Sequence, residues 1–171
     1  MRHLWAPWRM SYVVDSKPDG CIFCTEAEQD TDRDNHILYR ARHNFVILNA
    51  YPYNSGHLMV VPYKHVSCIT ELGISALQEM FLVAQGCVQV MNEYLHAEGL
   101  NIGINIGQAA GAGIEQHLHL HVVPRWSGDT NYMTSVADTR VVPQDLDETY
   151  AGLQPVLKEA LEEKLLCLCG D

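Results

Sequence analysis

Short runs of apolar residues, bounded by turn-forming residues, recur along the chain and are typical of β-strands. They predict five strands, at residues 36–40, 45–49, 57–62, 100–106 and 117–123. In the last segment three histidines alternate with Leu118, Leu120 and Val122, so the histidines are expected on one face and the apolar side chains on the other. The hairpin-like spacing of the strands favours an antiparallel sheet over parallel βαβ units.

A second periodicity, with apolar residues three and four positions apart, predicts one long helix and a C-terminal helix. The long helix is expected to bury Leu77, Met80, Phe81, Ala84, Val88, Met91 and Leu95. Ser75 is its expected N-cap and Gly99 its expected C-terminal stop. The C-terminal helix is expected at residues 146–166, and residues 25–35 are expected to form a solvated loop or a short helix. The expected fold class is therefore α+β, with a five-stranded antiparallel sheet.

The length of 171 residues fits one domain with a sizeable core. An aromatic N-terminal arm is expected at residues 1–20 and the core of the domain at residues 21–130. Residues 131–171 are expected to form a C-terminal extension that carries its helix and belongs to the same domain.

Composition and charge narrow the class of protein. Hydrophobic residues make up 47% of the chain and charged residues 19%, which is typical of a folded globular protein. The formal net charge of -10 argues against binding to nucleic acid or to an anionic membrane surface, because both bind basic faces. A small phosphate compound would need a local positive potential, from backbone N–H groups, histidines and one or two arginines.

The chain shows no apolar run that approaches a membrane span and no apolar signal-peptide core at its N-terminus. These features predict a cytoplasmic protein. Its six cysteines are then better interpreted as thiols or metal ligands than as disulfides.

Cys21 and Cys24 form a C-x-x-C motif, which suits two thiolate ligands on one tetrahedral zinc ion. His65 and one histidine of the 117–121 row are the candidates for the other two ligands, and Cys68 is a competing ligand. Buried free thiols and a redox pair are the alternatives, but a thioredoxin-like redox pair would need a βαβ context that the sequence lacks.

His117, His119 and His121 are the best candidates for chemistry in the chain. A neutral imidazole is a competent nucleophile at phosphorus near pH 7, since its ordinary pKa is ~6.5. Neighbouring imidazoles on the same face can donate hydrogen bonds to phosphate oxygens as charge develops. The alternatives are a metal held by all three rings and a set of structural core histidines.

The loop before this row is rich in small residues. The N–H groups of Gly107, Gly111 and Gly113 can cradle a phosphate, although a plain flexible connection explains the composition equally well.

The combination of these motifs resembles the histidine triad (HIT) family of nucleotide hydrolases and transferases. The resemblance is carried by Cys21-x-x-Cys24, Asn49, residues 56–62, His65, residues 105–107 and the histidine row with its Val-Val-Pro ending. Within the family the chain looks most like the bacterial diadenosine tetraphosphate phosphorylase branch, on residues 4–10, 51–57 and 124–131. The resemblance implies a HIT-type fold and a homodimer.

The resemblance also implies roles by position. His119 matches the nucleophile that forms a nucleotidyl intermediate, His121 the histidine that contacts the α-phosphate, and His57 a supporting histidine. The implied nucleotide-binding residues are Asn49, Asn105, Gly107, Gln108, Gly111, Gly113 and Trp126. The implied ligands of a structural zinc are Cys21, Cys24, His65 and His117. No catalytic metal is required by these residues.

The expected activity is attack on the α-phosphate of a nucleoside polyphosphate such as diadenosine tetraphosphate. The acceptor stays open, because Ala112-Gly113 stands where the phosphorylase branch carries Gly-Ser, and Gln108 is one possible substitute for the missing hydroxyl. Two rival hypotheses are a non-catalytic, zinc-stabilised nucleotide-binding protein and a metalloenzyme that uses the three histidines as ligands.

Overall fold

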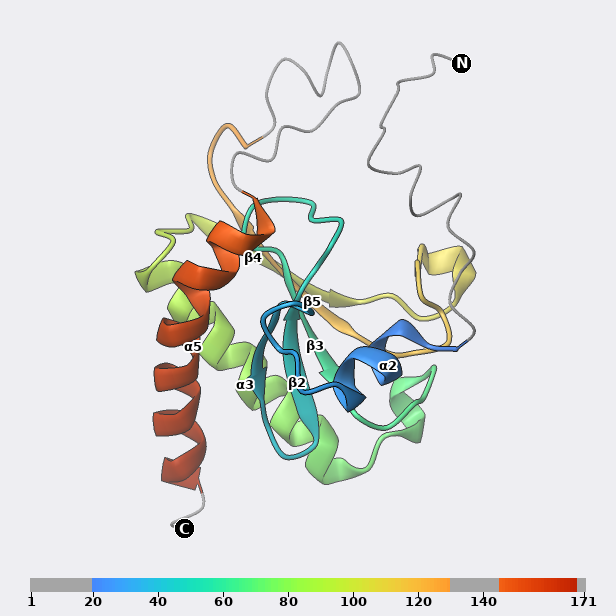
Figure 1. Ribbon diagram of the computed structural model, residues 1–171. Helices are drawn as coiled ribbons and strands as arrows, with labels where there is room; N and C mark the ends of the chain where they lie inside the picture. The colour runs from blue at the N-terminus through green and yellow to red at the C-terminus, as the bar shows by residue number, and fades with distance from the viewer. Residues whose placement is uncertain (1–19, 130–144, 169–171) are drawn as a thin grey trace, which may run out of the picture.

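The computed structural model describes residues 20–129 and 145–168, so the expected N-terminal arm up to residue 19 and all of residues 131–144 lie outside the described part (Figure 1). Its helices are α2 (Ile22–Glu28), α3 (Ile74–Glu93) and α5 (Leu146–Leu168), with 3-10 turns η1 (Ile69–Glu71) and η2 (Gln108–Ala110). Its strands are β1 (Ile37–Arg40), β2 (Asn44–Leu48), β3 (Leu58–Pro62), β4 (Gly99–Ile104) and β5 (Leu120–Arg125).

The five strands form one antiparallel sheet in the order β1-β2-β3-β5-β4, which confirms the α+β class. Helices α3 and α5 lie on one face of the sheet, and α2 lies on the other (Figure 1). The larger core cluster fills the space between the sheet and the two long helices. The smaller one packs Phe23 of α2 against the opposite face, on Phe45, Met59 and Val61.

The histidine strand differs from its expected bounds, because β5 begins at Leu120 rather than at residue 117 and continues to Arg125. The segment before it is held by other contacts. The N–H of Leu118 donates to the carbonyl of Val66 at 2.6 Å, and the ring of His117 lies 2.8 Å from the carbonyl of Pro62. The alternation nevertheless survives, since Leu118 and Leu120 join the larger core.

Helix α3 also corrects the expected caps. It begins at Ile74 with Gly73 as N-cap, because the carbonyl of Gly73 already accepts the N–H of Leu77, and Ser75 lies inside the first turn. It ends at Glu93, while Gly99 opens strand β4.

The buried stripe of α3 is rotated from the expected one. It consists of Met80, Val83, Ala84, Gly86, Cys87, Val90 and Met91. Phe81, expected in the core, is 52% exposed, because the helix turns this flank away from both the sheet and α5. By length and composition alone α3 is apolar enough to cross a membrane, which the sequence reading did not anticipate. Seven of its residues are buried, and a mostly buried core helix passes the same test of length and composition.

The C-terminal helix matches its prediction closely. Leu153, Leu157 and Leu161 are buried, and α5 packs along α3 and strand β1 (Figure 1). Residues 25–35 were expected to form a solvated loop or a short helix. The first part of this segment is helical, since α2 continues to Glu28.

Candidate functional site

Four side chains from three separate segments converge behind the histidine row. Cys21 and Cys24 come from the start of α2, His65 follows β3, and His117 precedes β5. Their ligand atoms all lie within 4.8 Å of one another. The Cys21 Sγ is 3.1 Å from the Nδ1 of His117, and the Cys24 Sγ is 3.3 Å from the Nδ1 of His65.

These spacings fit a tetrahedral zinc site. Bonds of about 2.3 Å to sulfur and 2.0–2.1 Å to nitrogen place neighbouring ligand atoms roughly 3.3–3.8 Å apart. The Nε2 of His117 lies 2.8 Å from the carbonyl of Pro62, which can only accept, so Nε2 carries the proton and Nδ1 is left for a metal.

Cys68, the competing candidate, does not join this cluster. Its Sγ accepts a hydrogen bond from the hydroxyl of Thr70 at 3.2 Å. Among the described residues, His117 is also the one member of the histidine row in the cluster. This arrangement argues against a metal shared by all three rings.

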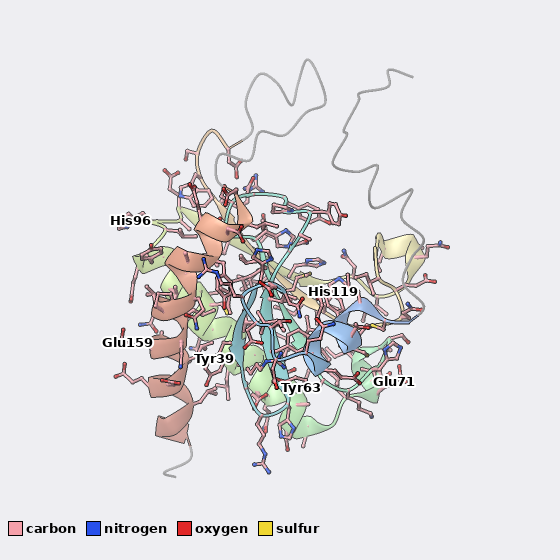
Figure 2. All side chains as sticks on the ribbon, viewed as in Figure 1. Tyr39, Tyr63, Glu71, His96, His119 and Glu159 are labelled. Atoms are coloured by element: carbon pink, nitrogen blue, oxygen red, sulfur yellow. The ribbon has the colours of Figure 1, made fainter. Side chains whose placement is uncertain are left out.

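His119 lies in a buried position over the sheet beside α2 (Figure 2). Its Nδ1 is 2.8 Å from the backbone carbonyl of His117, so Nδ1 must carry the proton and Nε2 keeps the lone pair. Burial lowers the pKa of the ring, although the hydrogen bond to the carbonyl opposes this shift. The result is a neutral imidazole whose Nε2 lone pair, among the described residues, is not used in a hydrogen bond.

A second chain of hydrogen bonds fixes His121. The backbone N–H of Tyr53 donates to the Nδ1 of His57 at 3.1 Å, so His57 must be protonated at Nε2. That Nε2–H donates to the Nδ1 of His121 at 3.0 Å, which leaves the proton of His121 on its Nε2. His121 is therefore oriented as a donor on the same side of the sheet as His119.

Both rings of this chain are held neutral. Burial, with added repulsion from neighbouring histidines, lowers the pKa of His57 to about 3 and that of His121 to about 4. Because both pKa values lie well below neutral pH, His57 and His121 each carry a single ring proton there and keep the tautomers assigned above.

Of the expected nucleotide-binding residues, Asn49 and Asn105 lie beside the histidines. The amide nitrogen of Asn49 is 3.4 Å from the Nδ1 of His57, and its oxygen accepts the N–H of Tyr51. Asn105 and His121 line one cavity of about 250 Å³.

The glycine loop and Trp126 do not line the cavity beside His121. Gly107 and Gly111 have φ angles of 80° and 85°, which only glycine adopts easily, and they bracket the exposed turn η2 that contains Gln108. Trp126 donates its indole N–H to the carbonyl of His96, which lies far from His119 (Figure 2). The structure does not bring Trp126 into the cavity beside His121 within one chain.

Phe23 is a site residue that the sequence reading missed. Its buried ring lies 5.4 Å from the ring of His117 and 5.2 Å from that of His119, so it packs against both histidines. Its place inside the C-x-x-C motif was a usable signal. Asn101 and Arg125, which the sequence analysis did not single out, also line the cavity, because the register of β4 and β5 brings them to the face that carries His121.

The fold places a row of histidines next to a Cys-Cys-His-His cluster. Comparisons with known proteins identify the family that has this combination. A family profile described as the HIT domain matches residues 30–128. The chain is 36% identical over 157 residues to a Mycobacterium tuberculosis protein named AP-4-A phosphorylase, covering 87% of this chain and 80% of that protein. The chain therefore belongs to the HIT family.

Two solved structures are similar. A zinc-bound histidine triad family protein of Mycobacterium smegmatis has a TM-score of 0.67 and 30% identity, covering 84% of this chain and 96% of that chain. A Plasmodium falciparum diadenosine triphosphate hydrolase shares the fold, with a TM-score of 0.60 and 16% identity over 92% of this chain and 97% of that chain.

Proposed function

We propose that the chain is a nucleotidyl hydrolase or transferase that acts on the α-phosphate of dinucleoside polyphosphates such as diadenosine tetraphosphate. The observation that carries the proposal is the neutral His119, whose proton is fixed on Nδ1 by the carbonyl of His117. The identity to a named AP-4-A phosphorylase supports the substrate class.

In the first step the Nε2 lone pair of His119 forms a bond to the α-phosphorus. The bond from that phosphorus to the bridging oxygen breaks, and its electron pair leaves with the distal nucleotide. The Nε2–H of His121 donates to the phosphate oxygens as charge develops, which lowers the barrier without any movement of the ring.

In the second step an oxygen of water or orthophosphate attacks the same phosphorus. The phosphorus–nitrogen bond breaks, and its electron pair returns to the Nε2 of His119. The proton of the attacking oxygen is released, so the histidine is regenerated in its original tautomer.

Zinc has a structural part in this proposal. Cys21, Cys24, His65 and His117 would hold the ion, which when bound supplies a crosslink between three chain segments. Because the carbonyl of His117 also orients His119, a fixed His117 keeps the nucleophile in register.

Product analysis tests the reaction and its acceptor. ADP plus ATP formed from diadenosine tetraphosphate only with orthophosphate identifies a phosphorylase. AMP plus ATP formed with water alone identifies a hydrolase that attacks the α-phosphate. Two ADP would also identify a hydrolase, but one that cleaves the central bridge, and would contradict attack at the α-phosphate. Mass spectrometry of quenched protein should find the nucleotide on His119, and His119→Ala should abolish both adduct and turnover. Binding of AMP with neither turnover nor adduct would show a non-catalytic nucleotide-binding protein.

We also propose that the chain works as a homodimer in the cytoplasm. Strand β4 is an edge strand that, among the described residues, pairs only with β5, and Ile102 on it is 47% exposed. Phe81 adds an exposed aromatic ring on α3. The described cysteines are free thiols, in keeping with a reducing compartment.

A further inference from the structure

The cavity beside His121 extends well beyond the catalytic histidines. Its lining includes Asn105 and His121 at one end and Asn101 and Arg125 at the other. The proposed function uses only the first pair, at the α-phosphate. A substrate with more phosphates has to place the rest of its phosphate chain somewhere on this surface.

The register of the two edge strands shows how the cavity is built. Gly103 pairs with His121, and Asn101 pairs with Val123. Side chains two residues apart share one face of a strand, so Arg125 lies in line with His121 on this face. A Cβ atom added at Gly103 would meet no atom within 4 Å, so the floor of the cavity beside His121 is open backbone.

A network of side chains fixes the far end of the cavity. Arg125 donates to both carboxylate oxygens of Asp129, and its Nη1 donates to the Oδ1 of Asn101 at 2.9 Å. Asp129 is held in turn by the amide of Asn54 at 2.7 Å. A guanidinium has five N–H donors, so two donors of Arg125 are not used in these bonds.

The same network sets the orientation of Asn101. Because its Oδ1 accepts from Arg125, its amide N–H groups point away from the guanidinium. Of the described residues that line the cavity, Arg125 alone carries a permanent positive charge. Asp129 offsets much of that charge, so the site offers directed donors rather than a strong general attraction for anions.

We propose that Arg125 and Asn101 bind the phosphate groups beyond the α-phosphate of a nucleoside polyphosphate, as a second phosphate subsite. The proposal rests on the proposed function, because that function places the α-phosphate at His119 and His121. The subsite selects for substrates with a phosphate chain and holds that chain as it leaves.

Equilibrium binding of two stable probes tests the subsite without any need for turnover. AMP occupies only the α-phosphate position, whereas α,β-methylene-ATP adds two phosphates and resists cleavage at the first bridge. Charge-assisted hydrogen bonds at a half-exposed site predict that the wild type binds α,β-methylene-ATP about tenfold more tightly than AMP.

Two variants should remove that preference while keeping AMP affinity. Arg125→Gln removes the cation. Asn101→Asp keeps the acceptor for Arg125 but replaces the amide donor by a carboxylate. Arg33→Gln is the matched control, because it removes one positive charge from an exposed position outside the cavity and should keep the full preference.

The proposal is overturned if the wild type shows no preference for the methylene probe, or if folded Arg125→Gln and Asn101→Asp variants keep it. Thermal unfolding identifies a variant that fails to fold, and the other of the two then decides. Turnover of diadenosine tetraphosphate is measured separately. A wild type with the binding preference but no turnover refutes the proposed function and leaves the subsite standing.

Discussion

His117, His119 and His121 are equivalent in sequence and different in chemistry because their ring nitrogens meet different partners. His117 points its Nδ1 at two cysteines, His119 points its Nδ1–H at a carbonyl, and His121 receives a hydrogen bond from His57. Two backbone carbonyls, of Pro62 and His117, and the backbone N–H of Tyr53 determine these tautomers, because none of these groups can reverse its role.

The neutral His57 leads to a prediction about acid stability. An unfolded histidine titrates near its ordinary pKa of ~6.5, whereas burial lowers the pKa of folded His57 to about 3. Between these values the unfolded chain binds more protons, so stability is present above pH ~6.5 and is lost as the pH falls toward 3. His57→Asn should flatten the dependence by up to ~1.4 kcal/mol per pH unit in this range.

Denaturant unfolding at several pH values measures the effect. Zinc ligands also take up protons when the protein unfolds, but the wild type and the variant share that contribution, so the difference in slope reports His57. Parallel curves for the two proteins would contradict a neutral His57.

At the residue scale, local spacing predicted which residues gather at the site. The C-x-x-C pair and the alternating histidines are recognisable without any partner. His65 was already a candidate ligand before the family resemblance was used, but the choice of His117 as its partner and the role of His57 needed the resemblance, because their contacts join distant parts of the chain. Arg125 was missed because its relation to Asn101 depends on strand register, which a single sequence does not display.

The Cys-Cys-His-His cluster connects separate elements, since it brings together α2, the segment after β3 and the segment before β5. Cys21→Ser is expected to reduce bound zinc from about one per chain to a small fraction and to lower the thermal midpoint, because the crosslink is a folding constraint. Metal analysis and thermal unfolding, with and without a chelator, measure the two effects.

Cys68→Ser is the matched control for that substitution. Cys68 is near the cluster in sequence, but its Sγ is engaged with Thr70. The variant should keep full zinc content and the wild-type midpoint. Zinc loss from Cys68→Ser, or its retention by Cys21→Ser, would show that the ligand set is wrong.

The contact between α3 and α5 gives a prediction about packing. A Cβ added at Gly86 would overlap the side chain of Leu161, which is fully buried. Alanine gains about 1 kcal/mol in helix propensity over glycine, but overpacking costs roughly 1–3 kcal/mol. Gly86→Ala should therefore destabilise the protein by about 1 kcal/mol.

The same substitution should stabilise a Leu161→Ala background, where the obstacle is gone. Urea unfolding of the two single variants and the double variant gives the coupling directly. An equal effect of Gly86→Ala in both backgrounds would mean that α5 does not pack on α3 at this position.

Elements were predicted well where one periodicity dominates and poorly where tertiary contacts decide. The C-terminal helix lies close to its expected bounds. The start of β5 was misplaced because Leu118 bonds to Val66 rather than to the β3 ladder. The buried face of α3 differs from the predicted one because Gly86, which has no side chain, lets α5 pack closely against that side of the helix.

At the scale of the whole molecule, one flank of α3 and the edge strand β4 expose apolar side chains to solvent. Gly86 faces α5, and Phe81, five residues away at ~100° per residue, lies on the opposite flank of the helix. Ile102 is half-exposed on the edge strand. Unpaired edges and exposed aromatic rings are costly to leave in water, and pairing with a second copy covers both.

We therefore expect Phe81→Glu and Ile102→Lys each to convert a dimer into a monomer in light scattering or sedimentation. Both side chains are half-exposed, so the fold of the single chain should lose only about 0.5 kcal/mol or less. Glu159→Lys, at an exposed position on α5, is the control for a change of charge and should leave the dimer intact. A monomeric wild type, or two variants that both stay dimeric, would place the subunit contact elsewhere or remove it.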